Sequence, residues 1–172
     1  MTDRLCAATA GDAPAAAELW RFSTRFYARR GVAEALLGLQ DRDGCDINLV
    51  LFALWLGISG RKRATRALFA AAERDTRALR RELVEPLRAL RRRLKGQADP
   101  DLRRLRAEVQ ALELAAEQAV QRRLASHAGP VFATDRAERL AAAQANFRLY
   151  LGRETAETAV ICAALAAFAE QN

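Results

Sequence analysis

The feature that most constrains this fold is the segment INLVLFALWLGI, residues 47–58, which contains no charged residue. Any helix formed by this segment carries large apolar side chains on nearly all sides, so it has to lie inside a bundle or beneath a partner. The segment is also well short of the ~20 residues that span a bilayer. We therefore predict a buried central helix over residues 47–59 and no membrane span.

The composition of the chain favours helices over strands. Its 172 residues include 24 leucines and 39 alanines but only seven valines and three isoleucines. Leucine and alanine lose little rotamer freedom in a helix, whereas β-branched residues suit a pleated sheet. A chain of this length also buries a sizeable core without help from disulfides or metals. We expect an all-α, single-domain bundle of about seven or eight helices around the apolar central helix.

Capping residues and hydrophobic spacing divide the chain into a short tail and one helical domain. Residues 1–11 are expected to be a flexible N-terminal tail, and residues 12–172 to form the domain. Its apolar N-terminal helices occupy residues 12–60, its basic helices and a long hairpin residues 61–128, and a C-terminal helix pair residues 129–172. The predicted helices cover residues 13–28, 32–40, 47–59, 61–72, 75–95, 100–126, 135–151 and 155–170.

The long hairpin is predicted to be antiparallel, on either side of the turn KGQADP at residues 95–100. We expect it to be held together by two apolar stripes, formed by Leu79, Leu83, Leu87, Leu90 and Leu94 on the first helix and by Leu102, Leu105, Val109, Leu112, Ala116 and Ala119 on the second. Pro86 lacks an amide donor and lies inside the first of these helices. It therefore predicts a kink or a break near Leu83.

Three stretches of the chain resemble a known family when they are taken in this order and spacing. They are LWRFSTRFYARRGV at 19–32, LQDRDGCDINLVLFALWLG at 39–57 and VEPLRALRRRLKG at 84–96. The family consists of bacterial proteins of about this length and is catalogued only as a domain of unknown function. The resemblance is close over residues 14–96. It implies a small, all-helical cytoplasmic protein and brings no reaction or ligand with it.

An acidic turn containing Asp41, Asp43 and Asp46 precedes the predicted central helix. A calcium loop starting at Asp41 would have Cys45 where an oxygen ligand is required and would lack the bidentate glutamate, so we expect no metal. Asp46 is well placed to cap the central helix. Capping does not explain Asp41 and Asn48, which leaves these two residues, with Asp46, as candidates for a ligand site.

Three aromatic residues are candidates either for the core or for a groove. Trp20, Tyr27 and Trp55 fall on predicted helices that also carry Leu and Phe, and such residues usually belong to a core. An aromatic-lined groove for a partner helix or an apolar ligand is the alternative.

A basic stripe is the most informative feature outside the predicted core. Residues 61–106 carry a net charge of +10, whereas the whole chain carries +7. The stripe consists of Arg77, Arg81, Arg88, Arg91, Arg92 and Lys95. A solvated network of ion pairs with Glu108, Glu113 and Glu117 is the favoured interpretation. A surface that binds nucleic acid or an acidic protein is the alternative, although no aromatic platform for stacking bases lies among the arginines.

Catalytic motifs are missing from the sequence. His127 is the only histidine and is expected at a helix end, where its ring can meet unpaired carbonyls. Cys6, Cys45 and Cys162 have no paired spacing, which argues against disulfides and zinc. No glycine-rich phosphate loop is present. We expect no catalytic residues, no cofactor and a cytoplasmic location.

The function favoured by these observations is that of a non-enzymatic binding or adaptor protein. It would dock an acidic or helical protein partner through the Trp20/Trp55 region or the face from Arg77 to Lys95. One alternative is binding of nucleic acid through the same arginines. Another is an enzyme or apolar-ligand binder with a pocket between the first and third helices, near Asp41, Asp46 and Asn48. The oligomeric state is left open.

Overall fold

The computed structural model describes residues 12–61, 63–132 and 134–171, and this part of the chain is all-helical, as the composition predicts. The predicted tail, residues 1–11, lies outside the described residues. The elements in chain order are α1 (Asp12–Tyr27), α2 (Val32–Asp43), α3 (Ile47–Ile58), α4 (Arg66–Leu79), a π-helical turn η1 (Arg80–Val84), α5 (Glu85–Arg93), α6 (Pro100–Ser126), α7 (Arg136–Leu151) and α8 (Ala156–Glu170).

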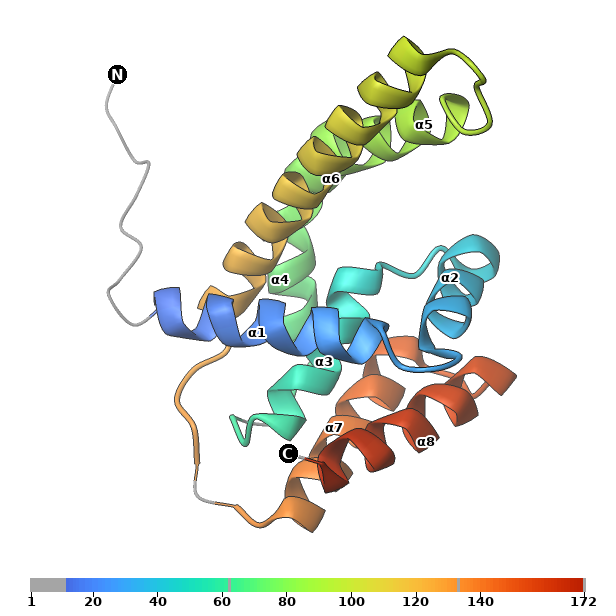
Figure 1. The fold of residues 1–172 in the computed structure, drawn as a ribbon. Helices are drawn as coiled ribbons and strands as arrows, with labels where there is room; N and C mark the ends of the chain where they lie inside the picture. The colour runs from blue at the N-terminus through green and yellow to red at the C-terminus, as the bar shows by residue number, and fades with distance from the viewer. Residues whose placement is uncertain (1–11, 62, 133, 172) are drawn as a thin grey trace, which may run out of the picture.

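The predicted central helix is confirmed as α3. Its residues from Asn48 to Gly57 are all buried, and the helix lies between α1 and α7 (Figure 1). Gly57 makes this arrangement possible, because a Cβ atom at that position would lie 2.1 Å from the backbone nitrogen of Ala143 on α7. The backbones of α3 and α7 therefore meet directly. Each large apolar side chain buried on α3 stabilises the fold by roughly 2 kcal/mol.

Aromatic packing joins the first helix to the last. The rings of Phe22 and Phe26 on α1 stack with their centroids 5.4 Å apart, and Phe168 on α8 meets both rings edge-on. Helix α2 packs against α8, and α1 also packs against α6. These contacts close the compact end of the molecule below the arm in Figure 1.

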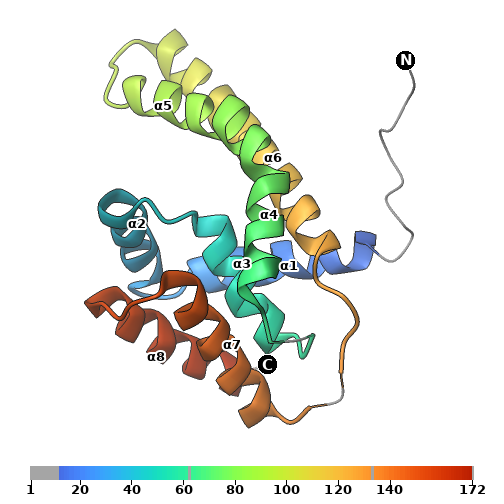
Figure 2. The ribbon, with the colours of Figure 1, turned by 180° about the vertical axis from the view of Figure 1, so that it is seen from behind.

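The predicted antiparallel hairpin is also confirmed. Elements α4, η1 and α5 follow one another without interruption and pair with α6 to form an arm that projects from the body (Figure 2). The predicted separation into helices at residues 61–72 and 75–95 is wrong, because α4 begins only at Arg66 and passes through residues 73–74 as a helix. The expected irregularity near Leu83 is the π-helical turn. Since Pro86 has no amide hydrogen to donate and its ring crowds the preceding turn, a wider turn just before it accommodates the ring.

The predicted pairing of two apolar stripes is only partly correct. A π-helical turn contains more residues than an α-helical one, so it shifts the face that later residues present. Val84 is buried in consequence, while Leu83 is 46 % exposed. On α6, Leu105 and Leu112 are exposed although Val109 and Ala116 are buried. No residue of α5 is fully buried, so the outer arm is held by half-buried side chains and ion pairs.

Candidate functional site

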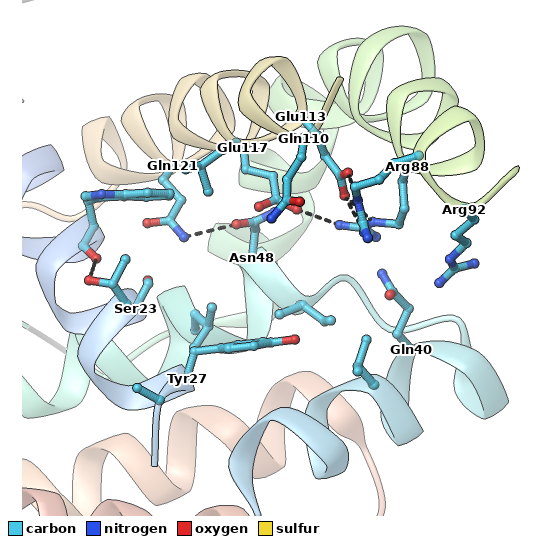
Figure 3. Close-up of a pocket in the computed structure, with 18 residues that line it drawn as sticks. Ser23, Tyr27, Gln40, Asn48, Arg88, Arg92, Gln110, Glu113, Glu117 and Gln121 are labelled. Atoms are coloured by element: carbon cyan, nitrogen blue, oxygen red, sulfur yellow. Dashed lines mark hydrogen bonds and ion pairs between the residues drawn. The ribbon is translucent and has the colours of Figure 1, made fainter. Parts of the chain in front are cut away.

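A cleft lies where the arm leaves the body. It has a volume of about 430 Å³ and is bounded by α1, α2 and the start of α3 on one side and by α5 and α6 on the other (Figure 3). A second cavity of about 300 Å³ lies beside it, between the α2–α3 connection and the start of α5. We call these the first and the second chamber. The residues that line both are Gln40, Ile47, Asn48, Arg88 and Arg92.

Eight of the twelve residues predicted for the site line these two chambers. The first chamber is lined by Trp20, Tyr27, Asn48, Arg88, Arg91 and Arg92, and the second by Asp41, Asp46, Asn48, Arg88 and Arg92. Residues on α1, α3 and α5 that were predicted from the sequence therefore come together in space.

The other four predicted residues lie elsewhere. Trp55 is buried against Phe52, and the guanidinium of Arg61 lies 4.8 Å from the centre of its ring. Arg77, Arg81 and Lys95 are exposed and line neither chamber. Trp55 therefore has a place in the core, as aromatic residues on such helices usually do.

The back wall of the first chamber is a pair of buried carboxamides. Gln121 on α6 donates from Nε2 to Oδ1 of Asn48 on α3 over 3.0 Å. The other carboxamide atom of Gln121, Oε1, is buried and has no hydrogen-bond partner among the described residues, and the same holds for Oγ of Ser23 and Oε1 of Gln40. Ser23 and Gln121 are each only 3 % exposed. Buried polar groups are nearly always hydrogen-bonded, so three unpaired oxygens around one cleft need an explanation.

An ion-pair network forms the wall between the chamber and the arm. Arg88 donates from Nε to Glu113 over 3.1 Å and from Nη2 to Glu117 over 2.6 Å. Arg91 donates from Nε and Nη2 to the two carboxylate oxygens of Glu113. These contacts agree with the predicted ion pairing of Arg88 and Arg91 with Glu113 and Glu117. The network is not solvated as predicted, because the side chains of Arg88 and Glu113 are only 17 % and 7 % exposed, and Glu108 pairs with Arg104 instead.

The two glutamates of this network differ in their acidity. Burial alone would raise the pKa of Glu113, but the hydrogen bonds from Arg91 and Arg88 outweigh burial and lower it. For Glu117 burial dominates and raises the pKa, although the charge of Arg88 opposes the change. Glu113 is therefore the firmly charged member of the pair, whereas burial disfavours the charged form of Glu117.

The second chamber is organised by the first turn of α3. The predicted cap is confirmed, because the side chain of Asp46 accepts a hydrogen bond from the backbone amide of Asn48 over 2.9 Å. Its second oxygen accepts from Arg80 on η1, also over 2.9 Å, and the amide of Asp46 donates to the Tyr150 hydroxyl. Burial raises the pKa of Tyr150, so its hydroxyl stays protonated.

The remaining groups of the second chamber are more loosely held. Asp41 is exposed and lies 3.9 Å from Arg92. Burial, followed by the charge of Asp43, raises the pKa of the Cys45 thiol, which makes this cysteine a poor nucleophile. The expected helix-end position of His127 is confirmed, because this residue is the C-cap of α6, with Nε2 lying 3.3 Å from Asp75.

Sequence reasoning missed Ser23, Gln40 and Gln121 as site residues. One signal was present, because Glu113, Glu117 and Gln121 follow one another at four-residue steps and so form a polar stripe on one face of α6. Polar residues on a face that also carries Val120 and Leu124 are unexpected unless that face meets partners or a cavity.

In the described part of the chain, no group of three or more His, Cys, Asp or Glu side chains could hold a metal ion. Over the same residues, no helix is both long enough and apolar enough to cross a membrane.

Comparison with known proteins places the chain in a family. Residues 18–124 match the family model described as protein of unknown function (DUF2390). No curated protein and no solved structure matches the chain. The matched span runs from the start of the cleft on α1 to the end of its wall on α6.

Proposed function

This chain belongs to the DUF2390 family of proteins of unknown function, and we propose that it is a binding protein that holds a small ligand in the first chamber. A volume of about 430 Å³ falls within the range of small-molecule sites. The chamber resembles such sites in having apolar side chains on its walls, although most of the residues that line it are polar or charged. The apolar lining includes Trp20, Tyr27, Leu37, Ile47, Leu51 and Leu114.

The observation that supports this proposal best is the set of unpaired oxygens of Ser23, Gln40 and Gln121. A protein that only had to fold would gain stability by pairing these groups or replacing them with apolar ones, because an unpaired buried polar group costs about 1–3 kcal/mol. A ligand with N–H or O–H donors would pair them once the side chains that cover these buried oxygens move aside. We therefore propose a ligand with a flat apolar body, which packs on Tyr27 and Trp20, and with hydrogen-bond donors on that body.

A blocking variant with a matched control tests this function. A library of small aromatic compounds with N–H or O–H donors would be screened by thermal shift and ligand-observed NMR against the wild type. Thr24→Trp adds bulk to a side chain that lines the chamber, and Arg21→Trp adds it to an exposed position of the same helix outside the chamber. Compounds that bind should lose affinity in the first variant and keep it in the second. A library without binders, or binders indifferent to Thr24→Trp, would contradict the proposal.

Docking of an acidic or helical protein remains a second proposal, supported by apolar side chains on the arm. Leu83 and Leu105 are 46 % and 43 % exposed within residues 61–106, where the positive charge is concentrated, and Leu112, which is 59 % exposed, follows on the same helix as Leu105. The variants that test it are Arg77→Glu and Arg81→Glu, since Arg88 and Arg91 serve the internal network. An unchanged set of captured partners would count against this surface.

Nucleic-acid binding through the arginine stripe has less support, because the network with Glu113 and Glu117 occupies two of its arginines. Such binding would have to weaken as salt rises. A cytoplasmic location stays part of the proposal, and it is supported by the free thiols of Cys45 and Cys162, which suit a reducing compartment.

A further inference from the structure

Resting on the proposed function, we infer that the ligand is an amphipathic acid whose single anionic group is bound by Arg92, with help from Arg88, at the junction of the two chambers. Both arginines line both chambers and lie one helical turn apart on α5. Figure 3 shows Arg88, Arg92 and Gln40 at one end of the cleft, Ser23 and Gln121 at the other, and Tyr27 between them. The site thus has a polar end, a cationic end and an aromatic floor.

The cations around the junction differ in how fully they are already engaged. Arg80 is held by Asp46 over 2.9 Å, and Arg91 is held by both oxygens of Glu113. Arg88 uses Nε and Nη2 for Glu113 and Glu117, while its Nη1 has no hydrogen bond to any described residue. Arg88 therefore keeps one free donor group on a side chain that its ion pairs hold in place.

Arg92 is the cation most available to a ligand. Its ion pair within the described residues is the 3.9 Å contact with Asp41, and the two side chains are 56 % and 62 % exposed. An ion pair of that length and exposure contributes little. An anionic group at the junction would instead meet Arg92 and the free Nη1 of Arg88 together and would accept charge-assisted hydrogen bonds from both. The anion would displace Asp41, which can return to solvent at little cost.

Two dyes with the same ring system separate the contribution of the anion from that of the apolar body. 1-Anilinonaphthalene-8-sulfonate carries one sulfonate, and N-phenyl-1-naphthylamine is its neutral counterpart. Their affinities would be measured by fluorescence titration for the wild type, for Arg92→Gln and for the control Arg93→Gln. Arg93 is the next residue on α5, is exposed and lines neither chamber. Both variants remove one positive charge, so they change the long-range field about equally.

We expect Arg92→Gln to lower the affinity for the sulfonate dye about tenfold, because one charge-assisted hydrogen bond is lost. The affinity for the neutral dye should stay within about twofold of the wild-type value. Arg93→Gln should leave the affinities for both dyes within about twofold of the wild-type values. The inference would be overturned if both variants lowered the affinity for the sulfonate dye equally, or if Arg92→Gln lowered the affinities for both dyes equally. Either result would still leave a ligand site in the cleft. The proposed function itself would be overturned if the wild type bound neither dye, or if Thr24→Trp lowered the affinity for neither dye.

Discussion

Gln121 on α6 and Asn48 on α3 are joined by a 3.0 Å hydrogen bond between buried carboxamides that are 73 residues apart in the chain. Asn48 is in the first turn of the central helix, two residues after its cap, Asp46. This bond therefore fixes the back wall of the cleft to the most deeply buried element of the fold. It holds the arm and the body at the separation that creates the first chamber.

Gln121→Leu should lower the free energy of unfolding by about 1–3 kcal/mol, because it leaves Oδ1 of Asn48 buried without its donor. Urea denaturation followed by circular dichroism would measure this change. Adding Asn48→Leu should cost less than Asn48→Leu alone costs in the wild type, since the two residues share one interaction. Strictly additive losses would show that the two carboxamides are not coupled.

Ser23→Ala should have opposite effects on stability and on binding. The hydroxyl of Ser23 has no hydrogen-bond partner in the described part of the chain, so its removal should leave the free energy of unfolding unchanged or raise it by up to about 1 kcal/mol. A ligand that donates to this oxygen should bind about fivefold to tenfold more weakly to the variant. Thermal denaturation of the free protein and titration with compounds from the screen would test both parts. A loss of stability by the free variant would mean that Ser23 has a structural role instead.

The elements predicted well from the sequence are those that depend on neighbours in the chain. The helix after Asp46 is determined by a local cap and an uninterrupted apolar run, and the hairpin by the turn at residues 95–100. A cap bonds to an amide two residues away, as Asp46 does to Asn48. Such contacts leave a pattern in the sequence that elementary rules recognise.

The cleft could be predicted only in part, because its polar residues meet across helices that are distant in sequence. Arg88 is paired with Glu117 across 29 positions, and nothing local says whether an arginine points at a glutamate or at solvent. The exposure of Leu83 likewise depends on how the chain accommodates Pro86. An α-helical register places Leu83 in the hairpin contact, and the π-helical turn buries Val84 there instead.

Glu113→Gln and Glu117→Gln should change the pH dependence of stability in opposite directions. The pKa of Glu113 is lowered in the fold, so its stabilising effect is present above the unfolded value of about 4.5 and is lost as the pH falls through the lower folded value. Glu113→Gln should therefore destabilise the protein by about 3 kcal/mol near pH 7, because Arg88 and Arg91 lose their shared partner. This deficit should shrink as the pH falls below about 4.5 and through the lowered folded value.

The matched variant Glu117→Gln should change the pH dependence of stability in the opposite direction. The pKa of Glu117 is raised, so its stabilising contribution is present below about 4.5 and is lost as the pH rises through the higher folded value. Relative to the wild type, Glu117→Gln should gain stability as the pH rises from about 4.5 through the raised folded value. Urea denaturation of all three proteins across this range would check both signs. Parallel curves for the two variants would contradict the assignment of Glu113 as the firmly charged member.

Gly57→Ala should be among the most damaging single substitutions in the protein. The new Cβ would lie 2.1 Å from the nitrogen and 2.3 Å from the Cα of Ala143, and backbone atoms cannot move aside as side chains do. Overpacking of this kind costs about 1–3 kcal/mol or more, since α3 and α7 have to separate.

Gly38→Ala is the matched control. Its Cβ would meet the flexible side chains of Arg42 and Glu157, and alanine favours a helix by about 0.5–1 kcal/mol over glycine. Thermal denaturation should give a large decrease in melting temperature for Gly57→Ala and little change or an increase for Gly38→Ala. Equal effects of the two variants would mean that α3 and α7 are not in backbone contact.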